Sequence, residues 1–145
     1  TWREFNIMKE IAAGKKGVAA LDSMFNVIDT SFMKGAWRMY FTSNHDENSW
    51  NKADYETMPG AIHAPFAILS QTYNRTIPLI YSGQEEPVLR PLQFFEKDPI
   101  TFNKYERASF YSTLLHLRKS NKAFVNCALQ SQRTLPKTSP VKHSL

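Results

Sequence analysis

Apolar residues recur at helical spacing in three parts of the chain. The first set lies between Phe5 and Ala12, the second between Val18 and Ile28, and the last between Phe110 and Leu117. Residues three and four apart share one face of an α-helix, so each set predicts an amphipathic helix. We expect the first two helices to be separated by a break at Gly14 to Gly17, and the last helix to fade at Ser120 and Asn121.

Two shorter apolar runs lack this helical spacing and predict β-strands. The run from Ala36 to Ser43 has bulky side chains on both faces, and the run from Ile77 to Tyr81 is similarly short and apolar. Such runs are typical of strands that are buried on both sides. Pro78 lies near the entrance of the second run, where a missing backbone donor is tolerated.

A further helix is predicted between these strands. Thr57 can cap it, Pro59 suits its first turn, and an apolar stripe follows from Ile62 to Tyr73, which Pro65 should kink. A long loop rich in proline and charge then runs from Gln84 to about Lys104. Strands that are separated by a crossover helix pair in parallel, so the order of elements predicts an α/β fold.

The chain divides into residues 1–124, which carry these patterns, and residues 125–145, which are polar. A segment dominated by Gln, Ser, Thr, Pro and Lys cannot bury enough apolar surface to fold, so we expect 125–145 to be a disordered or aberrant tail. No apolar run approaches the ~20 residues that cross a bilayer, and no membrane partner is expected.

The net charge of +5 does not indicate a nucleic-acid partner, because part of it lies in the tail. Arg133, Lys137 and Lys142 lie there without any acidic residue, so the remaining chain is only mildly basic and carries no basic stripe. Cys127 is the single cysteine, which excludes an internal disulfide and a metal site built from cysteines.

Polar, titratable clusters follow both predicted strands. Ser43 to Glu47 come after the first strand, and Ser82 to Glu86 come after the second. The carboxyl ends of parallel strands are where ligands and catalytic groups gather in α/β folds. These clusters are therefore the candidate functional residues.

Each cluster also has a structural interpretation. Asn44 to Asn48 can form a turn in which short polar side chains bond their own backbone. Glu85 and Glu86 can be solvated loop charges, and we favour this interpretation for Glu86. A structural or solvated role is also favoured for three other histidines: His63, His116 and His143.

A metal site built from His45 and Asp46 is an alternative, because both are ordinary metal ligands. Adjacent residues of a strand point to opposite faces, so only a turned backbone would bring both to one ion. Metal phosphohydrolases that use a His-Asp pair need further histidines, and no histidine of the chain has that spacing. We therefore predict no metal ligands in the chain.

Three motifs resemble the α-amylase superfamily of glycoside hydrolases, and they stand in the order of that family. Arg38 to Trp50, RMYFTSNHDENSW, resembles its seventh-strand region with the Asn-His-Asp signature. Ile77 to Glu85, IPLIYSGQE, resembles the eighth strand, and Leu92 to Phe102, LQFFEKDPITF, the loop before the last helix. Arg3 to Gly17 and Leu114 to Phe124 are similar to the helix after the sixth strand and to the end of the barrel.

The resemblance implies that residues 1–124 are the C-terminal portion of a catalytic TIM-type (β/α)8 barrel, its last two to three β/α units. A whole barrel takes ~250 residues, so the chain supplies only an arc with open sheet edges. We expect the isolated chain to fold poorly or to associate. Arg75 and Thr76 replace a Pro-Gly pair that is frequent in the family, Pro65 interrupts a usually unbroken helix, and residues 125–145 lack the strand pattern of the small β domain that usually follows.

The resemblance also implies a retaining glycoside hydrolase acting on α-glucans such as starch and maltooligosaccharides. In that family the nucleophile and the general acid lie on the fourth and fifth strands, which have no counterpart in this chain. The chain alone is therefore expected to be inactive without the N-terminal barrel portion. A non-catalytic carbohydrate-binding relative is the main alternative, and a metal phosphohydrolase is the other.

Within this family Asp46 matches the third catalytic carboxylate, which grips sugar hydroxyls next to the reacting carbon. His45 matches the histidine that donates to a hydroxyl of the same sugar. Asn44 and Trp50 are further candidate substrate-binding residues, although Asn44 can instead position the loop. Aromatic side chains stack on the apolar faces of sugars, so Phe94 and Phe95 either do the same or pack under the loop. No cofactor is expected in this segment, and calcium would belong to the intact parent.

Overall fold

The computed structural model describes residues 1–52, 54–73 and 75–126. Its first two elements are α1 (Trp2–Ala12) and α2 (Ala19–Ser31), as the apolar spacing predicts. The Thr1 hydroxyl caps α1 by accepting from the backbone N–H of Glu4 at 3.4 Å. Gly14 adopts a φ of +69° in the turn that follows, a conformation that favours glycine.

The two predicted strands pair in parallel, so the described chain is a mixed structure of helices and a parallel sheet, which is compatible with the predicted α/β fold. β1 (Arg38–Tyr40) lies beside β2 (Thr76–Pro78), with Met39 opposite Ile77 and Tyr40 opposite Pro78. Both strands are shorter than the apolar runs from which they were predicted. Pro78 has no N–H to donate, so the ladder ends at the last residue of β2 instead of continuing to Tyr81.

The crossover between the strands contains α3 (Asp54–Thr57), a 3₁₀ turn (Gly60–Ile62) and α4 (His63–Thr72). The predicted capping role of Thr57 is wrong, because Thr57 ends α3 and its hydroxyl donates to the Asp54 carbonyl at 3.2 Å. Pro65 lies in the first turn of α4 and not in its interior as predicted. A first-turn residue needs no intrahelical donor, so proline is tolerated there.

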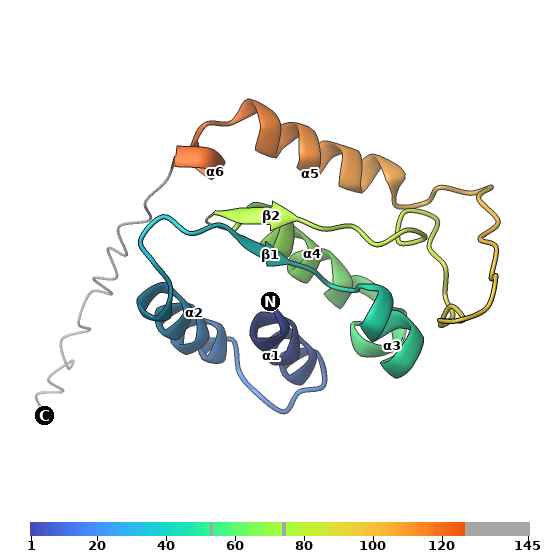
Figure 1. Cartoon of the computed structure of the whole chain (residues 1–145), viewed down its shortest axis with the longest axis horizontal. Helices are drawn as coiled ribbons and strands as arrows, with labels where there is room; N and C mark the ends of the chain where they lie inside the picture. Colours follow the sequence, from blue (N-terminus) through green and yellow to red (C-terminus); the bar gives the residue numbers. More distant parts are fainter. Residues whose placement is uncertain (53, 74, 127–145) are drawn as a thin grey trace, which may run out of the picture.

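A long irregular segment leads from β2 to α5 (Ala108–Ser120), and α6 (Ala123–Asn126) follows. Arg118 of α5 is buried and donates to the carbonyl oxygens of Gln71, at 3.4 Å, and of Thr76. This side chain fixes α5 to the end of α4 and to β2. Figure 1 shows α5 running alongside β2. The predicted tail began at residue 125, but Val125 and Asn126 belong to α6, and 127–145 lie outside the described residues.

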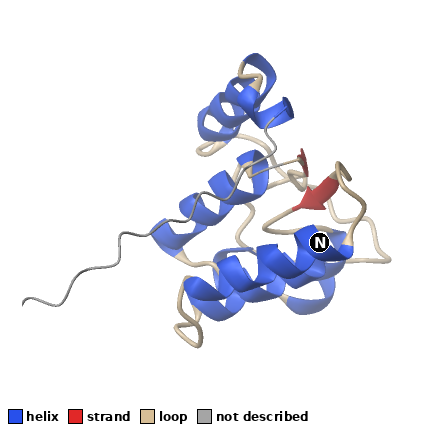
Figure 2. Ribbon diagram, turned by 90° about the vertical axis from the view of Figure 1, so that its left-hand side faces the viewer, coloured by secondary structure: helices blue, strands red, loops and turns tan. Residues whose placement is uncertain are grey.

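The core lies between the sheet and the helices. One cluster contains Phe5, Met8, Phe41, Met58 and Phe66, and a second contains Met24, Phe25, Ile28 and Tyr40. In Figure 2 most of the helical mass lies on one side of the two strands. None of the described helices is both long and apolar enough to pass through a membrane.

None of the described helices covers the other face of the sheet, which corrects the prediction of strands buried on both sides. Met39 and Ile77 are neighbours across the ladder, and both are 45% exposed. Trp37, just before β1, is 47% exposed. Tyr40 points the other way and is buried against α2, so only one face of β1 contributes to the core.

Candidate functional site

The segment after β1 turns at once into helical backbone. The Asn44 side-chain oxygen accepts the backbone N–H of Glu47 at 2.8 Å, which caps a turn that continues into a π-helical segment, Glu47–Asn51. Asn44 is itself buried. This bond is the self-capping turn that the sequence allowed, and it favours the positioning alternative for Asn44.

Two buried side chains hold this turn in place. The Glu47 carboxylate accepts from the Trp2 indole at 2.8 Å and from Asn51 at 2.9 Å, and it lies 3.4 Å from the Lys9 ammonium. Asn48 accepts the backbone N–H of Leu92 at 2.8 Å, which joins the turn to the segment after β2. Neither role was predicted from the sequence, although the spacing of Asn44, Glu47 and Asn48 places all three on one helical face.

The opposite side of the same turn faces solvent. His45 and Asp46 side chains are 66% and 42% exposed, and His45 Nε2 lies 3.5 Å from Asp46 Oδ1. Trp50 follows Asp46 by four residues and is 58% exposed, so both can reach the same ligand. The structure therefore presents His45, Asp46 and Trp50 together, while Asn44 lies beneath them.

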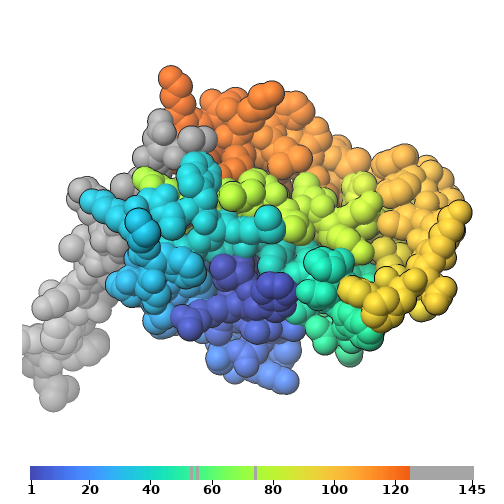
Figure 3. Space-filling model, in the orientation of Figure 1, coloured from blue at the N-terminus to red at the C-terminus, as the bar shows by residue number. Residues whose placement is uncertain are grey.

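The two phenylalanines of the predicted sugar-stacking set lie beside Trp50. Ring centroids are 5.0 Å apart for Trp50 and Phe94, 5.7 Å for Trp50 and Phe95, and 4.9 Å for Phe94 and Phe95. We call these three rings the aromatic platform. The His45 ring is roughly parallel to that of Phe94 at 6.1 Å, so the platform is continuous with His45. In Figure 3 the yellow segment that carries the phenylalanines lies against the teal turn after β1.

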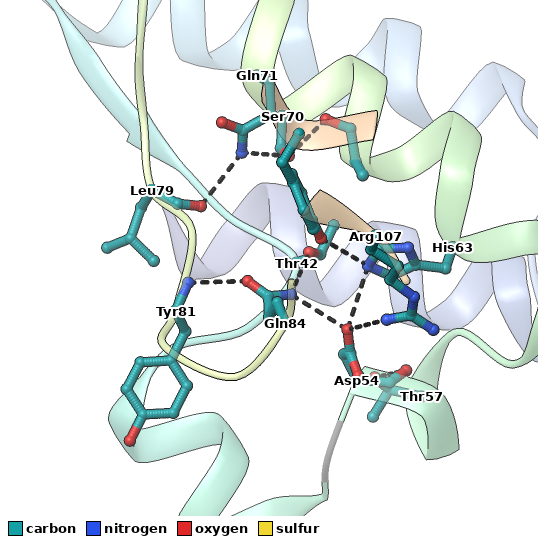
Figure 4. A network of polar contacts seen from close by, with 12 residues as sticks. Thr42, Asp54, Thr57, His63, Ser70, Gln71, Leu79, Tyr81, Gln84 and Arg107 are labelled. Carbon is teal, nitrogen blue, oxygen red and sulfur yellow. Dashed lines mark hydrogen bonds and ion pairs between the residues drawn. The ribbon is translucent and has the colours of Figure 1, made fainter. Parts of the chain in front are cut away.

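A second group of polar side chains connects five parts of the chain. We call it the polar hub, and its members are Thr42, Asp54, His63, Gln84, Arg107 and Tyr111. Asp54 is its centre, with a carboxylate oxygen 3.1 Å from each of His63, Gln84 and Arg107. Tyr111 Oη lies 3.1 Å from the same His63 nitrogen. Figure 4 shows the labelled members of the hub converging from the two strand ends and three helical segments.

The hub stabilises the charged form of Asp54. Burial is the largest single influence and opposes ionisation, but hydrogen bonds from His63 and Gln84 and the charges of His63 and Arg107 outweigh it. The pKa of the Asp54 carboxyl is therefore lowered from its ordinary value. The role predicted for His63, structural and not ligand-binding, agrees with this buried position.

The segment after β2 is held by its own polar side chains. Gln84 accepts from the Tyr81 N–H at 2.9 Å and donates to Thr42 at 3.0 Å, so it spans the ends of both strands. The Glu85 carboxylate accepts the Gly83 N–H at 2.9 Å. These contacts hold the backbone after β2, and they do not indicate that Gln84 or Glu85 forms a catalytic group of its own.

The prediction of a solvated Glu86 is wrong. Glu86 is only 6% exposed, and its carboxylate accepts the backbone N–H groups of Asn103, Lys104 and Tyr105 at 3.0–3.2 Å. The Tyr105 N–H contributes most to lowering the pKa of this carboxyl. The donors lie 17–19 residues further along the chain, so no local pattern could have predicted them.

Hollows elsewhere in the molecule do not coincide with the candidate site. One of about 500 Å³ is lined by residues of α1, of α2 and of the turn between them, such as Arg3 and Met24, and not by His45 or Asp46. Within residues 1–52, 54–73 and 75–126, no three His, Cys, Asp or Glu side chains form a group that could hold a metal ion. A ligand at Asp46 would therefore lie on an open surface formed by the turn and the platform.

No protein-family profile, curated protein or solved structure matches the chain.

Proposed function

We propose that this chain is the C-terminal part of the catalytic barrel of an α-amylase-type retaining glycoside hydrolase that acts on α-glucans. In this proposal β1 and β2 are the seventh and eighth strands of a partial (β/α)8 barrel. Their parallel pairing through α4 and the helices on one side support this assignment. The uncovered face with Met39 and Ile77 would then line the barrel interior.

The observation that carries the proposal is the position of Asp46. It comes six residues after the end of β1, on the exposed side of a turn that is fixed from below by Asn44 and Glu47. A carboxylate at the carboxyl end of a parallel strand is well placed to act on a substrate. His45, 3.5 Å away, would donate to a hydroxyl of the same sugar.

The proposed chemistry divides the catalytic roles between this chain and the rest of the barrel. Retaining hydrolysis needs a nucleophile and a general acid, which the family carries on strands without counterpart here. Asp46 would accept hydrogen bonds from the hydroxyls next to the reacting carbon. Such bonds strengthen as positive charge develops on the sugar, and comparable preorganised groups contribute about 3 to 4 kcal/mol to transition-state binding.

Binding of maltoheptaose to the purified chain, followed by titration calorimetry, tests the proposal. Asp46→Asn should weaken binding, because a neutral amide accepts weaker hydrogen bonds than a carboxylate. Glu10→Gln is the matched control, because the Glu10 side chain is also 42% exposed but lies on α1. No binding by the wild-type chain, or equal binding by Asp46→Asn and the control, would count against the proposal.

Activity assays address the alternative functions. We expect no hydrolysis of starch by the chain, and turnover that disappears with Asp46→Asn would contradict this division of roles. A non-catalytic carbohydrate-binding relative would bind glucan but would stay inactive even when it is part of a complete barrel. A phosphohydrolase that uses His45 and Asp46 as metal ligands would hydrolyse phosphate esters and lose that activity with a chelator.

A further inference from the structure

The connection between α2 and β1 carries large apolar side chains that are exposed to solvent. Phe32 is 49% exposed, Met33 85% and Trp37 47%. A turn closes this connection, because the Ala36 N–H donates to the Met33 carbonyl at 3.0 Å. Gly35 has a φ of +89° at the third position of the turn, a conformation that favours glycine. The exposed position of Met33 is therefore fixed by the backbone.

Positively charged side chains surround this connection. Lys34 lies in the turn itself, and the Arg75 guanidinium occupies the space that a side chain at Gly35 would need. The Arg118 guanidinium lies 5.8 Å from the centre of the Trp37 ring, so the end of α5 adjoins the same connection. Figure 1 shows the connection and the end of α5 at the same end of the molecule.

Acidic residues are almost absent from the three segments that meet here. Segments 29–38, 75–78 and 118–126 contain one acidic residue, Asp29, and Arg38 binds it at 2.9 Å. Six residues of these segments are basic: Lys34, Arg38, Arg75, Arg118, Lys119 and Lys122. No basic stripe was predicted from the sequence, because these residues come from three separate segments. The fold gathers them around the apolar connection.

This combination suits an anionic membrane surface better than an acidic protein. Aromatic and other apolar side chains enter the boundary between headgroups and acyl chains, while the long side chains of lysine and arginine keep their charges at the headgroups. A stable protein interface buries ~800 Å² on each partner and draws on about 20–30 residues. A single turn with its flanking cations is much smaller, whereas a membrane can accept a few apolar side chains by themselves.

We propose that the connection between α2 and β1 is a contact site for an anionic membrane surface. Met33 and Trp37 insert among the lipids, and Lys34 and Arg75 contact the lipid phosphates. No membrane partner was expected from the sequence, because no apolar run crosses a bilayer, but a surface contact needs no such run. The inference is independent of the proposed function. The contact lies before β1 and the candidate site after it, so a bound chain would keep that site directed away from the lipid.

Flotation of the full chain with lipid vesicles tests the proposal. The chain should bind vesicles made of equal parts of phosphatidylcholine and phosphatidylglycerol, and much less to vesicles of phosphatidylcholine alone. Added salt should weaken the binding, because it screens exposed charges. Lys34→Glu should lower the partition coefficient roughly tenfold, since it reverses a charge that is attracted to the surface. Met33→Ser should lower it about three- to tenfold through the loss of inserted apolar area.

Two matched controls make the same kinds of change elsewhere. Lys15→Glu reverses the charge of an exposed lysine between α1 and α2. Leu89→Ser removes an apolar side chain that is 54% exposed in the segment after β2. Both controls should have much smaller effects on vesicle binding than the variants in the connection.

No binding of the wild-type chain to anionic vesicles would overturn the proposal, and so would equal effects of each variant and its control. If Lys34→Glu weakens binding and Met33→Ser does not, the surface acts through charge alone and the proposed insertion is wrong. Poly-glutamate that binds as tightly as the vesicles and displaces them would indicate an acidic protein as the partner and would contradict the membrane contact.

Discussion

Asp54 is the centre of the polar hub and is buried with all of its partners close by. Its carboxylate has three charged or amide partners at 3.1 Å, and its side chain is only 4% exposed. Asp54→Ala leaves His63 and Arg107 without their acidic partner and should lower the free energy of unfolding by about 3–5 kcal/mol. Urea unfolding measures the loss, and Asp46→Ala, at an exposed aspartate, should change stability by less than about 0.5 kcal/mol.

The lowered pKa of Asp54 also fixes the direction of its pH dependence. Its stabilising effect is fully present above the ordinary carboxyl pKa of about 4 and is lost as the pH falls through the lower pKa of the folded protein. The difference in stability between wild type and Asp54→Ala should therefore shrink in strong acid. A constant difference down to that range would contradict the charged hub.

Glu4 should produce the opposite pH dependence. Neither carboxyl oxygen has a hydrogen bond of ordinary geometry within the described chain, and burial raises its pKa to about 8. The Thr1 amino group and the Phe41 N–H favour the ionised form and offset burial only in part. Because the unfolded chain ionises Glu4 at lower pH, stability should fall between about pH 4.5 and 8, by up to about 1.4 kcal/mol per pH unit.

Glu4→Gln should remove this decline, so the variant should gain stability over wild type at pH 8 and much less at pH 5. Urea midpoints at the two pH values measure it. Glu10→Gln, on the same helix but 42% exposed, is the control and should leave the decline unchanged. A wild-type midpoint that does not change between pH 5 and 8 would refute a buried neutral Glu4.

Among the elements, the turn after β2 depends on one glycine. Gly83 has a φ of +99°, and a Cβ there would lie 2.8 Å from Val88 Cγ2. Gly83→Ala should lower stability by about 1–3 kcal/mol through backbone strain and this clash. Gly17→Ala, where a Cβ meets nothing within 4 Å, should be neutral or slightly stabilising, and equal effects in thermal unfolding would contradict this explanation.

The helices and strands show how much of the fold could be predicted from patterns in the sequence. Helical periodicity predicted α1, α2 and α5 closely, because each buries one apolar stripe. The predicted strands were longer and more buried than the observed ones. Bulky apolar residues occur in a strand whether or not a second layer of structure covers its outer face, so the sequence does not reveal the exposure. Met39 reads as a core residue in the sequence and is exposed in the structure.

The candidate site was predictable in part for a similar reason. His45, Asp46 and Trp50 lie in one contiguous motif, so a short pattern could bring them together. The partners of Asp54 lie 9 to 53 positions along the chain, and those of Glu86 at least 17, so only the fold identifies them. Contacts of that separation leave no periodic signal.

For the whole molecule, the uncovered sheet face predicts association. Met39 and Ile77 form an apolar pair on a face that no described helix covers, and such patches promote contacts between chains. Sedimentation velocity should show larger species as concentration rises, and Met39→Ser with Ile77→Ser should reduce them. Leu115→Ser with Leu117→Ser, at 41% and 42% exposed positions of α5, is the control and should have less effect.

The polar hub has a consequence for limited proteolysis of the chain. Its members stand at positions from Thr42 to Tyr111, and the three that contact the buried Asp54 carboxylate come from separate parts of this stretch. No shorter piece contains a complete set, so a protease should find no stable intermediate digestion product within this stretch. Once one bond there is cut and the pieces separate, we expect rapid degradation of both.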